Sequence, residues 1–164
     1  MNWASIRPHL RPTQVSWRTA KCFKDSNPQF FSTKKHSAWT GWSPVNPEVA
    51  LPRVVRSRII KRRSHLQAVE EPGEPNAETL VELLSPDGLY RLTPRSGRTH
   101  QLRVHMASLG IAVDGDPLYP KVIHIADDDF SAPLQLLAQR IEFDDPLTRA
   151  RRSFVSPRRL DSRR

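Results

Sequence analysis

The sequence has only one cysteine and no long apolar run. Cys22 is the single cysteine among 164 residues, so no disulfide can form within the chain and a cysteine-based zinc site is excluded. Such cysteine usage is typical of a reducing compartment, and we expect a cytoplasmic protein. No stretch approaches the roughly 20 apolar residues that a membrane-spanning helix needs. The first residues also lack the apolar core of a secretory signal, so the sequence predicts neither secretion nor a membrane partner.

Acidic residues are scarce as well. The chain has 26 Lys and Arg against 17 Asp and Glu, which gives a formal net charge of +9 and a sequence pI near 10.6. Most of the positive charge is arginine, whose planar guanidinium pairs with phosphate and stacks on bases. This composition favours a nucleic-acid partner over the alternative, a soluble protein with an ordinary basic surface.

The chain divides into three parts by composition. Residues 1–45 hold all four tryptophans, the cysteine and one acidic residue, Asp25, without a sustained helical or strand period. We interpret them as an atypical basic segment of irregular structure: a disordered arm, an irregular domain edge, or sequence translated out of the frame of a longer ancestral gene. A globular pattern runs from residue 46 to residue 158, and residues 159–164 form a basic tail.

Strand signals dominate the globular part. Two β-branched pairs in residues 54–60 suit a strand or a helix edge, and residues 70–76 are typical of a loop. Residues 77–84 and 89–94 predict two strands, and the Ser-Pro-Asp-Gly turn between them predicts an antiparallel hairpin. Further strands are expected near residues 134–143, after a short helical turn, and at residues 151–156.

One helix is predicted over residues 98–109. Ser96 or Thr99 would cap its first turn, and Gly110 would end it in the left-handed conformation. Leu102, Met106 and Leu109 recur with helical spacing and form its buried stripe. Arg98, Gln101 and His105 lie beside that stripe, whereas His100 and Arg103 lie on the far side.

The start of this helix has the composition of an anion site. Arg98 and Arg103 are natural partners for phosphate or carboxylate, and a helix N-terminus adds backbone N–H groups with a positive dipole end. Gly97 would let a backbone approach closely. The alternative is a solvated basic helix with a capped start.

Other chemistries fit the sequence poorly. His100 and His105 lie five residues apart, about 140° around a helix, unlike metal-binding pairs that share one face, so we predict no metal. Asp114 and Asp116, like the acidic run at residues 127–129, are typical of turns. Ser96 lacks the surroundings of an activated nucleophile, which argues against a hydrolase triad.

A longer pattern includes the helix start. From Pro94 the chain reads Pro-Arg-Ser-Gly-Arg-Thr-His-Gln-Leu-Arg-Val-His, followed by Leu-Gly and then by Gly-Asp-x-x-Tyr up to Tyr119. This segment, Leu92–Tyr119, resembles a signature of the RluA-type pseudouridine synthases, which isomerise uridine in structured RNA. Weaker similarity extends over about residues 46–158 and corresponds to the later part of that family's catalytic domain. The resemblance implies an α+β fold, with a mixed, largely antiparallel sheet and packed helices.

The resemblance also implies a reaction. In that family an aspartate in an Arg-Leu-Asp motif acts on a flipped uridine, whose base detaches, rotates and rejoins the ribose through C5 with help from a tyrosine of a Lys-x-Tyr motif, and no cofactor is needed. Arg98 or Arg103 resembles the arginine that holds the aspartate and the RNA. Upstream of residue 95 this chain has neither motif, and Arg159-Leu160-Asp161 at the end lacks the Thr-Ser-Gly context, so we read Asp161 as a chance match.

These patterns lead to two predictions of function. The first is an RNA pseudouridine synthase acting on structured RNA such as rRNA or tRNA, in a truncated form without the catalytic aspartate. The alternative is a non-catalytic RNA-binding module in which Trp39 or Trp42 stacks on bases; charge alone would also allow a structural protein of the ribosome. In both main cases the predicted RNA-binding residues are Arg56, Arg58, Lys61, Arg62, Arg95, Arg98, His100, Gln101, Arg103 and His105.

Overall fold

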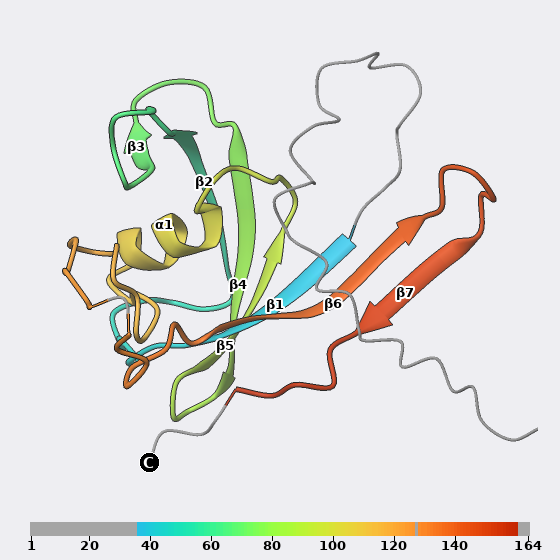
Figure 1. Ribbon diagram of the computed structural model, residues 1–164. Coiled ribbons are helices and arrows are strands. Elements are labelled where there is room, and N and C mark those ends of the chain that lie inside the picture. The colour runs from blue at the N-terminus through green and yellow to red at the C-terminus, as the bar shows by residue number, and fades with distance from the viewer. Residues whose placement is uncertain (1–35, 127, 161–164) are drawn as a thin grey trace, which may run out of the picture. The chain divides into compact units, whose positions relative to one another are not determined.

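The computed structural model describes residues 36–126 and 128–160, which form a twisted antiparallel sheet with one helix against it (Figure 1). The described elements are β1 (His36–Trp42), β2 (Arg53–Ile60), β3 (Val69–Glu71), β4 (Ala77–Ser85), β5 (Leu89–Pro94), α1 (Gln101–Ser108), β6 (Leu136–Asp144) and β7 (Arg151–Val155). The seven strands lie in the order β3-β2-β4-β5-β1-β6-β7. The strand pairs are antiparallel throughout this part of the chain, so the predicted antiparallel character is confirmed, while a mixed sheet and more than one packed helix are not seen in it.

The predicted hairpin is present as β4 and β5. Its turn is closed by a hydrogen bond from the Gly88 N–H to the Ser85 carbonyl, at 3.0 Å. Gly88 has φ +106, and a Cβ there would collide with the carbonyl oxygen of Ser43. Because only glycine adopts this conformation without strain, the Ser-Pro-Asp-Gly signal identified the turn correctly.

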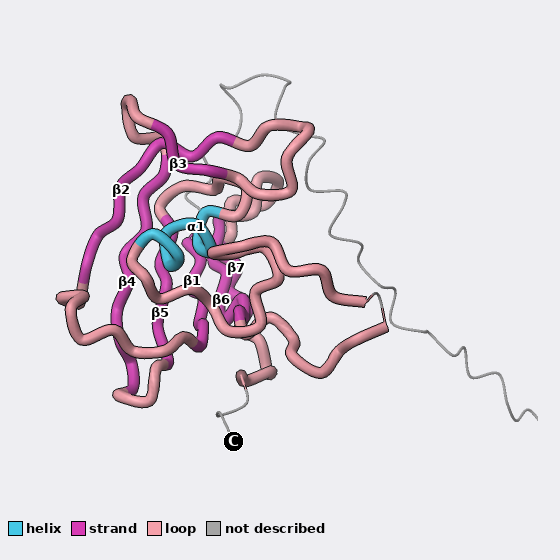
Figure 2. Tube along the Cα trace, turned by 90° about the vertical axis from the view of Figure 1, so that its left-hand side faces the viewer, coloured by secondary structure: helices cyan, strands magenta, loops and turns pink. Residues whose placement is uncertain are grey.

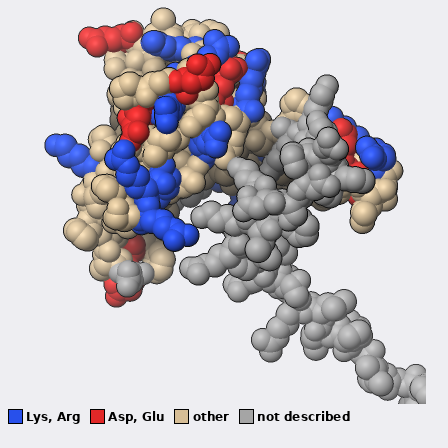
Figure 3. All heavy atoms as spheres, turned by 90° about the horizontal axis from the view of Figure 1, so that it is seen from above, with Lys and Arg blue, Asp and Glu red and all other residues tan. Residues whose placement is uncertain are grey.

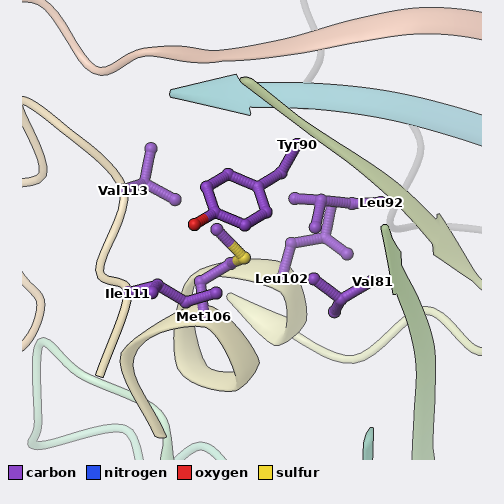
Figure 4. Packing of buried hydrophobic residues seen from close by; sticks show 7 residues of the cluster. All are labelled: Val81, Tyr90, Leu92, Leu102, Met106, Ile111 and Val113. Carbon is purple, nitrogen blue, oxygen red and sulfur yellow. The ribbon is translucent and has the colours of Figure 1, made fainter. Parts of the chain in front are cut away.

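The core lies between the middle of the sheet and α1 (Figure 4). Alternate residues of β4 and β5 face the helix, as the two-residue period of a strand requires. The buried cluster comprises Val81, Tyr90, Leu92, Leu102, Met106, Ile111 and Val113. Burying side chains of this size contributes about 1.5–3 kcal/mol each relative to exposure. The predicted buried stripe is confirmed for Leu102 and Met106, whereas Leu109 is only partly buried.

The expectation of irregular structure through residue 45 is wrong for its last part. His36–Trp42 form β1, which lies inside the sheet between β5 and β6. Glycine, serine and threonine interrupt the apolar alternation of this strand, so its local pattern was weak. Its pairing partners lie far away along the chain, from Trp42 with Leu89 to His36 with Glu142. Membership in the sheet argues against an out-of-frame origin for these seven residues. Residues 1–35 lie outside the described part of the chain.

The helix starts later than predicted and without the expected cap. His100 is the N-cap residue, has φ 58 and makes no side-chain capping bond. The Gln101 side chain instead reaches back to the loop before the helix, where its amide oxygen accepts a hydrogen bond from the Arg98 N–H at 3.0 Å. Gly110, with φ +72, ends the helix as predicted.

Two smaller differences concern loops. Residues 69–71 form the short strand β3, so the loop predicted for residues 70–76 begins later than expected. The short helical turn expected at the start of residues 134–143 is not seen, because residues 134 and 135 are irregular and β6 begins at Leu136. The late strands are present as the β6–β7 hairpin, which extends away from α1 (Figure 1). Figure 2 shows α1 against the strands of the sheet. Across residues 36–126 and 128–160, no helix is long and apolar enough to cross a membrane.

Candidate functional site

A pocket of about 590 Å³ opens beside the N-terminal end of α1. Its volume lies in the range of about 300–1,000 Å³ that is typical of small-ligand sites. The residues that line it are Ser37, Trp39, Pro94, Arg95, Ser96, Gly97, Arg98, His100, Gln101, Leu102, Arg103 and Leu136. Three arginines thus meet an apolar wall, and none of these described lining residues is acidic.

The loop that carries Arg95 and Arg98 is held by hydrogen bonds to Gln101. The Gln101 amide oxygen accepts from the Ser96 hydroxyl at 2.9 Å and from the Arg98 N–H, while its amide nitrogen donates to the Glu78 carbonyl at 2.9 Å. Ser96 in turn accepts from the Glu78 N–H at 2.8 Å. The loop is therefore fixed to β4, and the two arginine side chains project from a rigid base.

Arg103 is oriented by a buried carboxylate. Its Nε donates to Asp116 at 2.7 Å, a second guanidinium nitrogen binds the other carboxylate oxygen, and the Arg103 side chain keeps 15% of its surface exposed. Asp116 also accepts from the Leu118 and Tyr119 N–H groups at 2.8 and 3.1 Å. Gly115 and Asp116 therefore lie in a turn, as predicted, and Asp116 also holds Arg103 at the wall of the pocket.

His100 lines the pocket and is hydrogen-bonded to Tyr119, which lies behind it and does not line the pocket. The Tyr119 hydroxyl accepts from the Ala68 N–H at 2.6 Å, donates to the Ala68 carbonyl at 2.9 Å, and lies 3.0 Å from His100 Nδ1. Since that hydroxyl proton is already donated, Nδ1 carries a proton and is the donor to the oxygen. Burial, with the positive charges of Arg103 and Lys61, holds the pKa of His100 below its ordinary value, and burial raises that of Tyr119.

His105 lies in the interior, which differs from its predicted role. The side chain is 0% exposed and is hydrogen-bonded to Ser57 at 3.0 Å and to Thr79 at 2.8 Å. A side chain without exposed surface cannot contact RNA in this conformation, so the structure assigns it to joining α1 with β2 and β4. Burial lowers the pKa of His105. Gln101 is also buried, and its amide is engaged by the loop and by Thr79.

The remaining predicted RNA-binding residues lie either around Glu78 or away from the pocket. Arg95 pairs with Glu78 at 3.2 Å, and Arg56 pairs with the same carboxylate at 2.8 Å. Because Ser57 reaches the helix, the neighbouring Arg56 and Arg58 point to the opposite face of the sheet. Arg58 lies against Gly73, Lys61 donates to the Arg62 carbonyl at 3.3 Å, and Arg62 pairs with Glu71. Arg58, Lys61 and Arg62 therefore line no part of the pocket.

Two residues of the pocket, Ser37 and Leu136, were not predicted as site residues. They reach it from β1 and β6, far away along the chain. Trp39 of β1, which was predicted to stack on bases, lines the pocket as well. Trp42, the other tryptophan predicted to stack on bases, is only 5% exposed and belongs to the core instead. The Asn76 carbonyl accepts from Arg98 Nε at 3.1 Å. No local pattern indicates such contacts, because they arise from sheet pairing.

On one face of the molecule, charges of both signs are mixed (Figure 3). Figure 3 shows basic and acidic side chains interspersed on the face seen from above. Within residues 36–126 and 128–160, no cluster of three or more His, Cys, Asp or Glu side chains could hold a metal ion.

Comparisons with known proteins find similarity to RNA pseudouridine synthases in sequence and in fold. It is 35% identical over 131 residues to the dual-specificity RNA pseudouridine synthase RluA of Pasteurella multocida, over 76% of this chain and 57% of that protein. It is 39% identical over 144 residues to RNA pseudouridine synthase 1 of Oryza sativa subsp. japonica, over 75% and 41%. The fold matches the solved structure of human RNA pseudouridylate synthase domain containing 1 with a TM-score of 0.60 and 21% identity, over 76% and 55%. No family model matches the chain.

The sequence similarity to RNA pseudouridine synthases, RluA of Pasteurella multocida among them, confirms the resemblance seen in Leu92–Tyr119. The human structure shares the fold. The chain spans only about half the length of the curated relatives that it matches.

Proposed function

We propose that the pocket beside α1 holds RNA for the isomerisation of uridine to pseudouridine. The observation that carries this proposal is the convergence of Arg95, Arg98 and Arg103 on one pocket with an apolar wall that includes Trp39. Arginines bind phosphates and aromatic rings stack on bases, so the pocket offers both contacts that a flipped nucleotide requires. Structured RNA such as rRNA or tRNA is the expected substrate class, and the cytoplasm is the expected location.

The described pocket supplies binding groups but no carboxylate. If the reaction proceeds as in the RluA-type family, the aspartate must come from a part of the polypeptide outside the described residues or from another chain. The part of the Arg103 guanidinium that is not engaged by Asp116 would then donate a hydrogen bond to that carboxylate or to a phosphate, while Gln101 and Asp116 keep the arginines in position. No metal or cofactor enters this proposal.

The isomerisation can be followed through the hydrogen on C5. The glycosidic C–N bond breaks, a C–C bond forms at C5, C5 loses its hydrogen and N1 gains one, so that the overall composition is unchanged. RNA transcribed with [5-³H]uridine therefore releases tritium to water with each conversion. We expect release that depends on Arg103, so that Arg103→Lys, which removes the bidentate geometry, loses about tenfold or more of the rate.

The absence of a carboxylate from the described lining of the pocket favours a second function, RNA binding without catalysis. If the chain binds RNA in a salt-dependent manner but releases no tritium, it is a non-catalytic RNA-binding module. If it neither binds RNA nor releases tritium, both proposals are wrong.

A further inference from the structure

Glu78 forms an ion-pair cluster with two arginines next to the pocket. Its carboxylate lies 2.8 Å from Arg56 Nε and 3.2 Å from an Arg95 guanidinium nitrogen. The Glu78 side chain is 24% exposed, whereas those of Arg56 and Arg95 are 59% and 69% exposed. Both arginines are thus open to a ligand from solvent.

The cluster lines a second hollow that adjoins the first. This hollow has a volume of about 440 Å³ and is lined by Arg56, Glu74, Pro75, Asn76, Ala77, Glu78, Arg95 and Ser96. Arg95 and Ser96 line the pocket beside α1 as well. A polynucleotide that leaves the pocket over the loop at Ser96 would therefore reach Arg56 next.

The main chain of Glu78 cannot move aside. Its N–H donates to the Ser96 hydroxyl at 2.8 Å, and its carbonyl accepts from the Arg95 N–H and from the Gln101 amide, both at 2.9 Å. Only the side chain can rotate away from the arginines. The hydrogen bond from Arg56 holds the pKa of Glu78 below its ordinary value, so the group is an anion at neutral pH.

We propose that Arg56 and Arg95 form a subsite for a phosphodiester group of RNA, and that the Glu78 carboxylate occupies this subsite in the free protein. The inference rests on the proposed function, because it assumes that RNA binds in the adjoining pocket. Carboxylate and phosphate present similar oxygens to guanidinium groups, and exposed ion pairs are weak because water screens them, so a phosphate can replace the carboxylate. Glu78 then weakens RNA binding.

The test is Glu78→Gln, which keeps the size of the side chain and removes its charge. Glu142→Gln on β6 is the matched control. The Glu142 side chain is also 24% exposed and pairs with two arginines, Arg151 at 2.9 Å and Arg140 at 3.4 Å. It lies three strands away from β4 in the sheet and lines neither hollow. Both variants change the net charge equally.

Binding of a fluorescein-labelled single-stranded oligouridine is measured by anisotropy over a salt series. We expect Glu78→Gln to bind several-fold tighter at low salt, with a slope of log affinity against log salt steeper by about 0.7 for one additional phosphate contact. Glu142→Gln should stay within about twofold of the wild type, since its arginines lie outside both hollows. Adding Arg95→Ala to Glu78→Gln should abolish the gain.

The possible failures are distinguishable. If the wild type binds RNA but Glu78→Gln binds no tighter than Glu142→Gln, the subsite is wrong and the proposed function stands. If the wild type does not bind RNA, the proposed function and the subsite are both wrong. Should Glu78→Gln fail to fold by circular dichroism, Arg56→Gln decides the question: it must weaken binding and flatten the salt slope, and unchanged binding overturns the subsite.

Discussion

Gln101 is the residue on which the geometry of the basic loop depends. Its amide oxygen accepts from Ser96 and from the Arg98 N–H, and its amide nitrogen donates to the Glu78 carbonyl and to the Thr79 hydroxyl. All of these groups are partly or fully buried, so none has water as a ready substitute. The residue acts by holding others in position rather than by contacting RNA through a charge.

Replacing Gln101 with alanine should both destabilise the domain and loosen the loop. Leaving buried polar groups unpaired costs about 1–3 kcal/mol for each group, so we expect a loss of at least about 2 kcal/mol in the free energy of unfolding. Urea denaturation measures this loss. Glu82→Ala, a change on the outer face of β4, is the control, and equal stability of the two variants would contradict the role given to Gln101.

Buried His105 predicts a dependence of stability on pH. Desolvation lowers its folded-state pKa below the ordinary 6.5, and the charge of Glu70 offsets this only in part. Above pH 6.5 the imidazole is neutral in both states and the stabilisation is fully present. As the pH falls below 6.5, the imidazole of His105 binds a proton in the unfolded chain but stays neutral in the folded one. The free energy of unfolding therefore declines by up to about 1.4 kcal/mol per pH unit.

The decline is measurable by urea denaturation between pH 7 and pH 5. His105→Gln should be less stable at pH 7 but should show a flatter profile, since one proton-binding group is removed from the unfolded chain. His100, whose pKa is also lowered by burial, contributes to the remaining slope. His65→Gln changes an exposed side chain and should keep the wild-type profile. A profile for His105→Gln as steep as that of the wild type would contradict this account.

At the scale of elements, the loop before α1 differs from the other glycine-containing turns. Gly97 does not have a positive φ, and a Cβ there would meet nothing within 4 Å. Gly115 has φ +67, and a Cβ there would collide with the Pro133 main chain. The first glycine therefore leaves room at the pocket, and the second is required by the fold.

Alanine substitutions should separate these two roles. Gly115→Ala should lower the free energy of unfolding by more than 1 kcal/mol, because it adds a collision to a strained backbone. Gly97→Ala should change stability by less than about 0.5 kcal/mol and should weaken RNA binding, because the methyl group fills space at the pocket. Thermal melting and anisotropy check the two effects. A Gly97→Ala variant that is destabilised like Gly115→Ala would show that this glycine serves the fold.

The elements that sequence predicted well are those whose signals are local. The β4–β5 hairpin follows from alternating residues around a Ser-Pro-Asp-Gly turn, and the end of α1 follows from Gly110. The start of α1 was misplaced because His100, which has φ 58 and makes no side-chain capping bond, is the N-cap residue, and no capping pattern indicates that. β1 was missed because its stability comes from pairing with β5 and β6 on both sides.

At the scale of the whole molecule, the site is an assembly of distant segments. The arginines of the pocket belong to a continuous sequence motif, which is why they could be predicted. Trp39 and Leu136 lie almost 100 residues apart and meet at the pocket only because β1 pairs with β6. The sequence could not exclude the basic residues of β2 from the pocket, because it does not show which face of the strand turns toward α1. Ser57 lies on that face, so Arg56 and Arg58 point to the other one.

The central claim is that RNA binds at the pocket beside α1 rather than to the basic surface in general. A salt titration of oligouridine binding tests it by comparing Arg95→Gln/Arg98→Gln with Arg140→Gln/Arg151→Gln, which removes the same charge from the β6–β7 hairpin. We predict that the first pair loses about tenfold or more in affinity and flattens the salt slope by about 0.7 for each lost phosphate contact, while the second pair stays close to the wild type. Equal losses for both pairs would contradict the claim, because binding would then follow net charge alone.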